Sequence, residues 1–86
     1  MNVCFTPIAW QQYNELQKDD RKLITKINQL IKDIERNGLL EGIGKPEALK
    51  YIKACSRRIN DEHRLVYNFD ENNNLIIFAC KGHYED

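Results

Sequence analysis

Charged and titratable side chains are unevenly placed in this chain, and its second half holds a combination that could act on a phosphate. A single acid, Glu47, stands among five basic residues, which are Lys45, Lys50, Lys53, Arg57 and Arg58. Further along the chain come Arg64, Lys81 and the pair His83-Tyr84. Taken singly, each of these residues has a simpler explanation, such as a solvated charged rim or a histidine exposed near a terminus. The second histidine, His63, is expected to be structural or exposed.

Taken together, these residue types match the requirements of one reaction, the cleavage of RNA by its own 2'-hydroxyl. That reaction needs a base for the hydroxyl, an acid for the leaving 5'-oxygen, and cations for the charge of the phosphorane. A carboxylate, a histidine and several arginines are sufficient, and neither a metal nor a cofactor is required. An exposed aromatic side chain such as Tyr84 can stack on a base or orient it. The sequence supplies the residue types, and their convergence depends on the fold.

Length and composition predict an ordinary globular protein. The 86 residues, 42% hydrophobic and 30% charged, are expected to form one domain over residues 1–86. The formal net charge is zero, so binding to nucleic acid needs a local basic cluster. Short apolar runs and the lack of a signal core at the N-terminus predict a cytoplasmic protein without a membrane span.

The three cysteines predict neither a disulfide framework nor a zinc site. They are odd in number and widely spaced, and no CxxC motif occurs. Cys4 and Cys80 lie in apolar runs that are typical of strands, where cysteine behaves as a small hydrophobic residue. Both are therefore expected to be buried.

A short strand at residues 3–5 and two helices are expected in the first half of the chain. Thr6 and Pro7 are typical of a helix start, and Asp19-Asp20 should end that helix and cap the next one. One face of the first helix consists of Trp10, Tyr13 and Leu16. The second helix should end at Asn37-Gly38. Its apolar stripe, at helical spacing, consists of Leu23, Ile24, Ile27, Leu30, Ile31 and Ile34.

The second half is expected to contain a connecting loop and three strands. Two glycines and a proline indicate a loop over residues 39–50, with one helical turn at Pro46–Leu49. The strands are expected at Cys55–Ile59, Arg64–Phe69 and Leu75–Lys81, with a hairpin turn at Asp70–Asn74. The order β-α-α-β-β-β predicts an α+β fold in which two helices cover one face of a mostly antiparallel sheet. The other face is then a candidate binding surface, and Arg64 points either toward it or into solvent.

Four stretches of the sequence resemble the YoeB/Txe family of bacterial toxins, within the RelE superfamily. They are "KINQLIKDIERNG", "GIGKPEALK", "SRRINDEHRLVY" and "ACKGHY", and they match in order and in register over nearly the whole chain. The resemblance implies the RelE-like fold, with two helices on a curved antiparallel sheet. It also implies a ribosome-dependent endoribonuclease that cuts mRNA in the decoding site and inhibits translation. The implied partners are a cognate antitoxin of the YefM/Phd type and a second copy of the toxin.

The resemblance also implies roles for individual residues. Glu47, in the GKPExLK motif, would be the general base, and Lys50 at the end of that motif would contact phosphate. Arg58 and Arg64 would neutralise the phosphate in the transition state. His83 would be the general acid. Tyr84 would orient the substrate or the acid.

The chain departs from the family pattern at three places. "YIKAC" replaces a stretch that is usually about two residues longer and carries Leu-Ser/Thr-Gly before two aromatic residues. Gly82 stands where an aromatic residue is usual, which is expected to loosen the backbone before His83. Glu85 and Asp86 follow the tyrosine at which the family usually stops. These departures leave two alternatives open: a binding or autorepressor module with protein or DNA partners, and an RNase that needs no ribosome.

Overall fold

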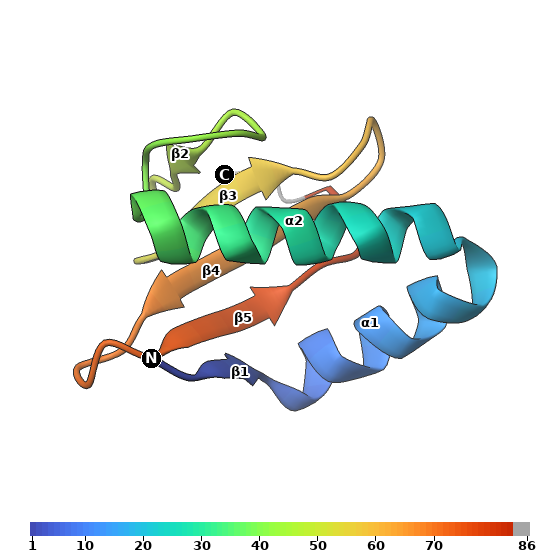
Figure 1. Ribbon diagram of the computed structural model, residues 1–86, viewed down its shortest axis with the longest axis horizontal. Coiled ribbons are helices and arrows are strands. Elements are labelled where there is room, and N and C mark those ends of the chain that lie inside the picture. Colours follow the sequence, from blue (N-terminus) through green and yellow to red (C-terminus); the bar gives the residue numbers. More distant parts are fainter. Residues whose placement is uncertain (84–86) are drawn as a thin grey trace.

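Two consecutive helices follow the first strand, and their boundaries are set by capping side chains. The computed structural model describes residues 1–83, in which α1 spans Pro7–Asp19 and α2 spans Arg21–Asn37 (Figure 1). The hydroxyl of Thr6 accepts a hydrogen bond from the amide of Ala9 at the start of α1. The carboxylate of Asp20 accepts one from the amide of Lys22 at the start of α2. Gly38, at a φ of 91°, ends α2, so the predicted helix starts and stops are confirmed.

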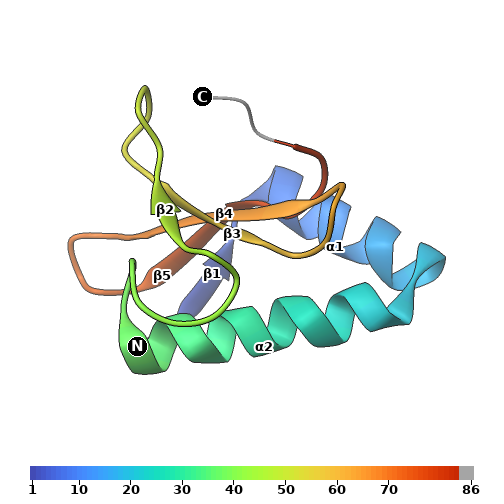
Figure 2. The same cartoon turned by 90° about the horizontal axis from the view of Figure 1, so that it is seen from above.

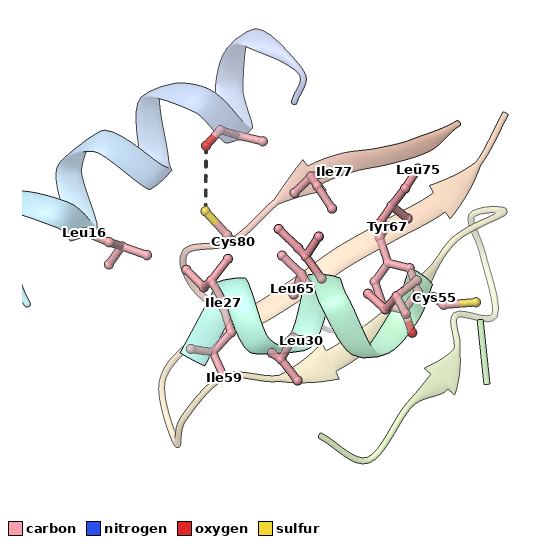
Figure 3. Packing of buried hydrophobic residues seen from close by; sticks show 13 residues of the cluster. Leu16, Ile27, Leu30, Cys55, Ile59, Leu65, Tyr67, Leu75, Ile77 and Cys80 are labelled. Carbon is pink, nitrogen blue, oxygen red and sulfur yellow. Dashed lines mark hydrogen bonds between the residues drawn. The ribbon is translucent and has the colours of Figure 1, made fainter. Parts of the chain in front are cut away.

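The apolar stripe of α2 forms the centre of the core, as predicted. Its residues Ile27, Leu30 and Ile34 are fully buried against the sheet. Figure 3 shows Leu65, Tyr67, Leu75 and Ile77 of the sheet on the other side of this contact. Cys80 is buried, as expected, and its Sγ lies 3.7 Å from the carbonyl oxygen of Ala9.

The sheet has five strands in the order β1-β5-β4-β3-β2. Their bounds are Val3–Phe5 (β1), Glu47–Ala48 (β2), Cys55–Arg58 (β3), Arg64–Phe69 (β4) and Leu75–Ala79 (β5). All neighbours pair antiparallel except β1 and β5, which are parallel, so the sheet is mixed rather than purely antiparallel. Parallel pairing needs a long connection, and here nearly the whole chain lies between the two strands. The predicted α+β class, with two helices and a sheet, is otherwise confirmed.

The helical turn predicted at Pro46–Leu49 is wrong. Glu47 and Ala48 instead form the edge strand β2, which pairs with Ser56 and Cys55 of β3. The amide of Leu49 continues this pairing by donating to the carbonyl of Ala54 over 2.9 Å. Pairing with the next strand, β3, thus overrides the local helical preference.

Two further predictions about single residues need correction. Cys4 is exposed, because Val3 and Phe5 are the residues of β1 that pack on the core. Lys81 lies beyond β5, which ends at Ala79.

The sheet has one face against the helices and one face that carries the polar residues of interest. Cross-strand pairs put Glu47, Ser56 and Val66 on the same face, whereas Leu65 and Tyr67 point into the core. In Figure 2, α2 lies on one side of the sheet, and the loop between β2 and β3 rises on the other. The predicted second face is therefore present, although Ser56 and Val66 on it are buried. Within residues 1–83, neither helix is long and apolar enough to span a membrane.

Candidate functional site

Glu47 and Arg64 lie side by side on the sheet face opposite the helices. Nη2 of Arg64 is 3.4 Å from Oε1 of Glu47. Nε of Arg64 donates to the hydroxyl of Ser56 over 3.0 Å, and Nη2 lies 3.5 Å from the carbonyl oxygen of Lys45. The Arg64 side chain is 13% exposed and that of Glu47 is 62% exposed. A firmly held cation therefore stands beside a carboxylate that a substrate can reach.

Arg58 brings a second cation to the same face. It is the cross-strand partner of Arg64 in the β3–β4 pair, so both side chains leave the same side of the sheet. The guanidinium of Arg58 forms an ion pair with Asp61 in the turn that follows β3. Both partners are substantially exposed, and exposed ion pairs are weak, so Arg58 can exchange Asp61 for another anion.

Lys50 stays outside the Glu47–Arg64 pair. It lies in the loop between β2 and β3, and its side chain is exposed. The same loop carries the exposed aromatic side chain of Tyr51. The predicted phosphate contact of Lys50 thus depends on a loop residue rather than on the framework of the sheet.

Arg57 does not belong to the basic surface suggested by its neighbours in the sequence. It is fully buried, and its guanidinium donates to Asp33 and Tyr67 and to the main-chain oxygens of Gly38, Glu41 and Ile43. Its hydrogen bond to Asp33 holds the pKa of that carboxyl below its usual range. This network ties the loop after α2 to β3, and the same loop leads into Glu47.

The segment after β5 is fastened to α1. The side-chain oxygen of Gln12 accepts hydrogen bonds from the amides of Cys80 (2.8 Å) and Lys81 (3.2 Å). Nζ of Lys81 lies 2.7 Å from a carboxylate oxygen of Glu15. The hydrogen bond between them raises the pKa of Lys81 and lowers the pKa of Glu15. Lys81 is therefore paired within the protein and is not a free cation of the candidate site.

The next two residues bring His83 to the start of β4. The amide of Arg64 donates to the carbonyl oxygen of Gly82 over 3.1 Å. The amide of Gly82 donates to Nδ1 of His63 over 2.8 Å. His83 follows directly and is exposed, one residue from this contact with Arg64. Tyr84, the predicted partner of His83, lies outside the described residues.

Sequence reasoning missed the residues that hold this segment. Gln12 and Glu15 lie on a helix some seventy residues earlier, and no local pattern connects them with Lys81. His63 is adjacent to Arg64 in the sequence, and this adjacency was the one available signal. Its expected structural role is compatible with the observed hydrogen bond.

The described part of the chain contains neither an activated buried thiol nor a metal site. Burial raises the pKa of the Cys80 thiol to about 11 and also raises the pKa of Cys55. Both groups therefore remain thiols near neutral pH. No cluster of three or more His, Cys, Asp or Glu residues within residues 1–83 could hold a metal ion.

The arrangement can therefore transfer protons and bind a phosphate. Glu47 can accept a proton, Arg64 presents positive charge beside it, and Arg58 adds a second cation on the same face of the sheet. His83 supplies an imidazole, the side chain that most often acts as a general acid or base in enzymes. These groups lie on an open surface, which suits a large substrate better than a small molecule.

Comparison with known proteins points to one family. A family model described as "YoeB-like toxin of bacterial type II toxin-antitoxin system" matches residues 5–84. The chain is 46% identical to Toxin YoeB of Synechocystis sp., with 99% of each protein covered. It is 43% identical to Toxin YoeB of Escherichia coli K12, with 98% of this chain and 100% of that protein covered.

Solved structures agree with this likeness. The YoeB dimer from Staphylococcus aureus matches with a TM-score of 0.91 and 51% identity, and 98% of each chain is covered. The toxin chain in a heterotetrameric YoeB–YefM complex from the same organism matches with a TM-score of 0.88 and 52% identity, again over 98% of each chain. A YoeB/ParE toxin from Agrobacterium tumefaciens matches with a TM-score of 0.91 and 37% identity, over 98% of this chain and 100% of that one.

Proposed function

Because the chain belongs to the family of YoeB-like toxins of bacterial type II toxin–antitoxin systems, we propose that it is a ribosome-dependent endoribonuclease that cleaves mRNA in the decoding site. The observation that carries the proposal is the Glu47–Arg64 pair, 3.4 Å apart, with His83 one residue from the main chain that contacts Arg64. Base, cation and acid are thus supplied by β2, β4 and the segment after β5. Cleavage of the message inhibits translation.

In the proposed reaction the 2'-oxygen of the message attacks the adjacent phosphorus. Glu47 takes the proton of the 2'-hydroxyl as the O2'–P bond forms, and His83 gives a proton to the 5'-oxygen as the P–O5' bond breaks. The products are a 2',3'-cyclic phosphate and a 5'-hydroxyl, and no further reagent is consumed. Arg64 stabilises the negative charge that develops on the phosphorane.

The remaining candidate residues are proposed to hold the substrate. Arg58 exchanges its exposed contact with Asp61 for a phosphate oxygen of the message. Lys50 approaches the backbone of the message from the exposed β2–β3 loop. Tyr84 orients a base or His83, and its role rests on the family resemblance alone.

The exposure of the acid and the base supports the need for a ribosome. Glu47 is 62% exposed and His83 is also exposed, so both groups are solvated in the free protein. Charges and hydrogen bonds act more strongly on a reaction once water is excluded around them. A ribosome with its message can cover this open surface and provide that exclusion.

We propose a YefM-type antitoxin and a second toxin chain as partners, and the cytoplasm as the location. YoeB–YefM complexes and a YoeB dimer are known from Staphylococcus aureus, at 51–52% identity to this chain. An antitoxin is required if the free toxin stops growth. The cytoplasm is where a protein that acts on translating ribosomes must work.

The decisive test compares the purified protein on programmed ribosomes with the same protein on naked message. Cleavage is expected only with ribosomes, and Glu47→Gln should lower its rate by roughly 10²–10⁴-fold, the usual contribution of a general base. Glu71→Gln is the matched control, because Glu71 is an exposed glutamate in the β4–β5 turn. Unchanged cleavage by Glu47→Gln would refute the role of Glu47. Cleavage of naked message would favour a ribosome-independent RNase, and translation arrest without a cut would favour a binding module.

A further inference from the structure

His63 contacts the chain at the last residue before the proposed general acid. Its Nδ1 accepts a hydrogen bond of 2.8 Å from the amide of Gly82. The carbonyl of the same glycine accepts one of 3.1 Å from the amide of Arg64. Both polar main-chain groups of Gly82 are therefore held by consecutive residues, His63 and Arg64. Within the described residues, these two hydrogen bonds are the ones that hold the main chain between Lys81, whose amide is bound by Gln12, and His83.

The imidazole that makes this contact is itself held on a fixed turn. The amide of His63 donates to the side-chain oxygen of Asn60 over 2.8 Å. The carbonyl of His63 accepts from the amide of Ile59 over 3.0 Å. The side chain is half-buried. Because an N–H group can only donate, Nδ1 must carry a lone pair, and the contact requires the neutral imidazole.

The backbone of Gly82 turns sharply at this contact. Its φ is +87°, a region that L-residues with side chains rarely adopt. Apart from its two chain neighbours, no described residue has an atom within 4 Å of the position that a Cβ would take, so the backbone angle, and not lack of space, favours glycine. The chain thus leaves β5, is held by Gln12, and turns at Gly82 onto the start of β4.

We propose that His63 is a positioning residue, which fixes His83 beside Arg64 and Glu47 by holding the amide of Gly82. The inference rests on the proposed nuclease function, because it assigns His63 a part in that reaction. His63 touches neither substrate nor reacting atoms; it acts through the main chain of Gly82. The glycine that is expected from its residue type to loosen the chain before His83 is, in this arrangement, the residue by which the chain is held.

Two substitutions of His63 separate the hydrogen bond from the bulk of the side chain. His63→Leu keeps a branched side chain and removes the acceptor. His63→Asn keeps an acceptor at nearly the same place, because Oδ1 of asparagine and Nδ1 of histidine are both bonded to Cγ. Glu62→Gln in the same turn is the control, since the Glu62 side chain is exposed. Thermal unfolding of each variant shows whether the fold is kept.

Hydrogen exchange at the amide of Gly82 tests the positioning without any use of activity. Its neighbours Lys81 and His83 are unchanged in all variants, so its chemical exchange rate is also unchanged. In His63→Leu the exchange is expected to be faster by at least about threefold, as the loss of one hydrogen bond predicts. His63→Asn and Glu62→Gln should remain close to the parent protein. Equal exchange in His63→Leu and the parent overturns the inference.

Cleavage on programmed ribosomes tests the consequence for the reaction. The cations proposed to bind phosphate are untouched, so KM should stay near its original value. We expect kcat to fall roughly ten- to a hundredfold in His63→Leu, the usual effect of misplacing a catalytic group, and to recover in His63→Asn. Faster exchange without a fall in kcat overturns the catalytic role. If the parent protein cleaves nothing, the proposed function fails, whereas exchange at Gly82 still decides whether His63 holds this segment.

Discussion

Removal of one hydroxyl, in Tyr67→Phe, should destabilise the protein far more than its size suggests. Tyr67 is fully buried. Its hydroxyl accepts a hydrogen bond from Nε of Arg57 (2.9 Å) and donates one to the carbonyl of Leu39 (2.6 Å). Phenylalanine fills the same space but leaves a guanidinium donor and a carbonyl without this partner. Each of these groups then lacks a hydrogen bond at a site that the folded chain shields from water.

The size of the effect follows from the cost of leaving buried polar groups unsatisfied. That cost is about 1–3 kcal/mol for a site of this kind. For a chain of 86 residues it corresponds to a fall in Tm of roughly 5–20 °C, at about 4–8 °C per kcal/mol. Thermal and urea unfolding followed by circular dichroism measure both quantities.

Tyr13→Phe is the matched control. The hydroxyl of Tyr13 also makes a hydrogen bond of 2.9 Å, but to the exposed side chain of Asn28. Its loss should change the free energy of unfolding by less than about 0.5 kcal/mol, because water replaces the partner. Equal losses of stability in Tyr67→Phe and Tyr13→Phe would refute the reasoning that burial makes the Tyr67 hydroxyl important.

Three further predictions concern acid stability, the core and a helix end. The hydrogen bond from Arg57 lowers the pKa of Asp33 in the folded protein. The Asp33 carboxylate therefore contributes fully to stability above its ordinary pKa of 3.8, and this contribution is lost as the pH falls through the lowered pKa of the folded protein. Asp33→Asn should therefore be less stable than the parent protein at neutral pH and should lose less stability between neutral pH and strong acid. Urea unfolding at several pH values measures this, and an identical loss of stability in acid for both proteins would contradict it. Ile27→Ala should lower the free energy of unfolding by about 2–5 kcal/mol, because it opens a cavity in the core. Ile8→Ala, at an exposed position, should change it by less than about 0.5 kcal/mol. Similar values for the two variants in urea unfolding would count against the assigned packing. Gly38→Ala should cost about 1–2 kcal/mol in thermal unfolding, because the glycine ends α2 at a φ of +91°, where a side chain strains the backbone. Among the described residues other than its chain neighbours, no atom lies in the way of a Cβ, so an unchanged Tm would argue against a strained angle there.

The sequence predicted well those elements whose signals lie within a few residues of one another. The stripe of α2 repeats along seventeen residues, and its buried members Ile27, Leu30 and Ile34 fall where the spacing places them. The turn at Asp70–Asn74 is likewise local. The carboxylate of Asp70 accepts hydrogen bonds from the amides of Asn72 and Asn74, and Asn73 adopts the expected positive φ. Strong local patterns of this kind need no knowledge of distant contacts.

The features that sequence reasoning missed depend on partners outside their own segments. β2 is a strand because Glu47 and Ala48 pair with β3, although its residues alone suggest a helical turn. Arg57 is buried because Asp33, on a helix twenty-four residues earlier, and the loop after that helix supply its hydrogen-bond partners. Its neighbour Arg58, of the same type, faces the other side of the sheet. Only the register of β3 decides which arginine is structural and which can bind a phosphate.

In the candidate site too, the residue types could be predicted from the sequence, whereas their placement depends on the fold. Residue types and family resemblance named Glu47, Arg64 and His83, and the fold brings Glu47 and Arg64 into contact. The position of His83, in contrast, depends on how residues 80–82 are held. Their amides are held by Gln12 and His63, which belong to α1 and to the turn before β4. A variant that keeps Glu47, Arg64 and His83 but loses the contacts of Gln12 and His63 would retain the reactive groups and lose the position of His83.

Gly82 illustrates why a departure from a family pattern has to be judged in the fold. By type alone, glycine before His83 increases backbone freedom. In place, it adopts a φ of +87°, and hydrogen bonds involve both its amide and its carbonyl. An L-residue in that left-handed region costs roughly 1–2 kcal/mol, comparable to the worth of one of these hydrogen bonds. A side chain at this position would therefore compete with the very contacts that bring His83 to Arg64, and restoring an aromatic residue there would weaken this attachment rather than strengthen it.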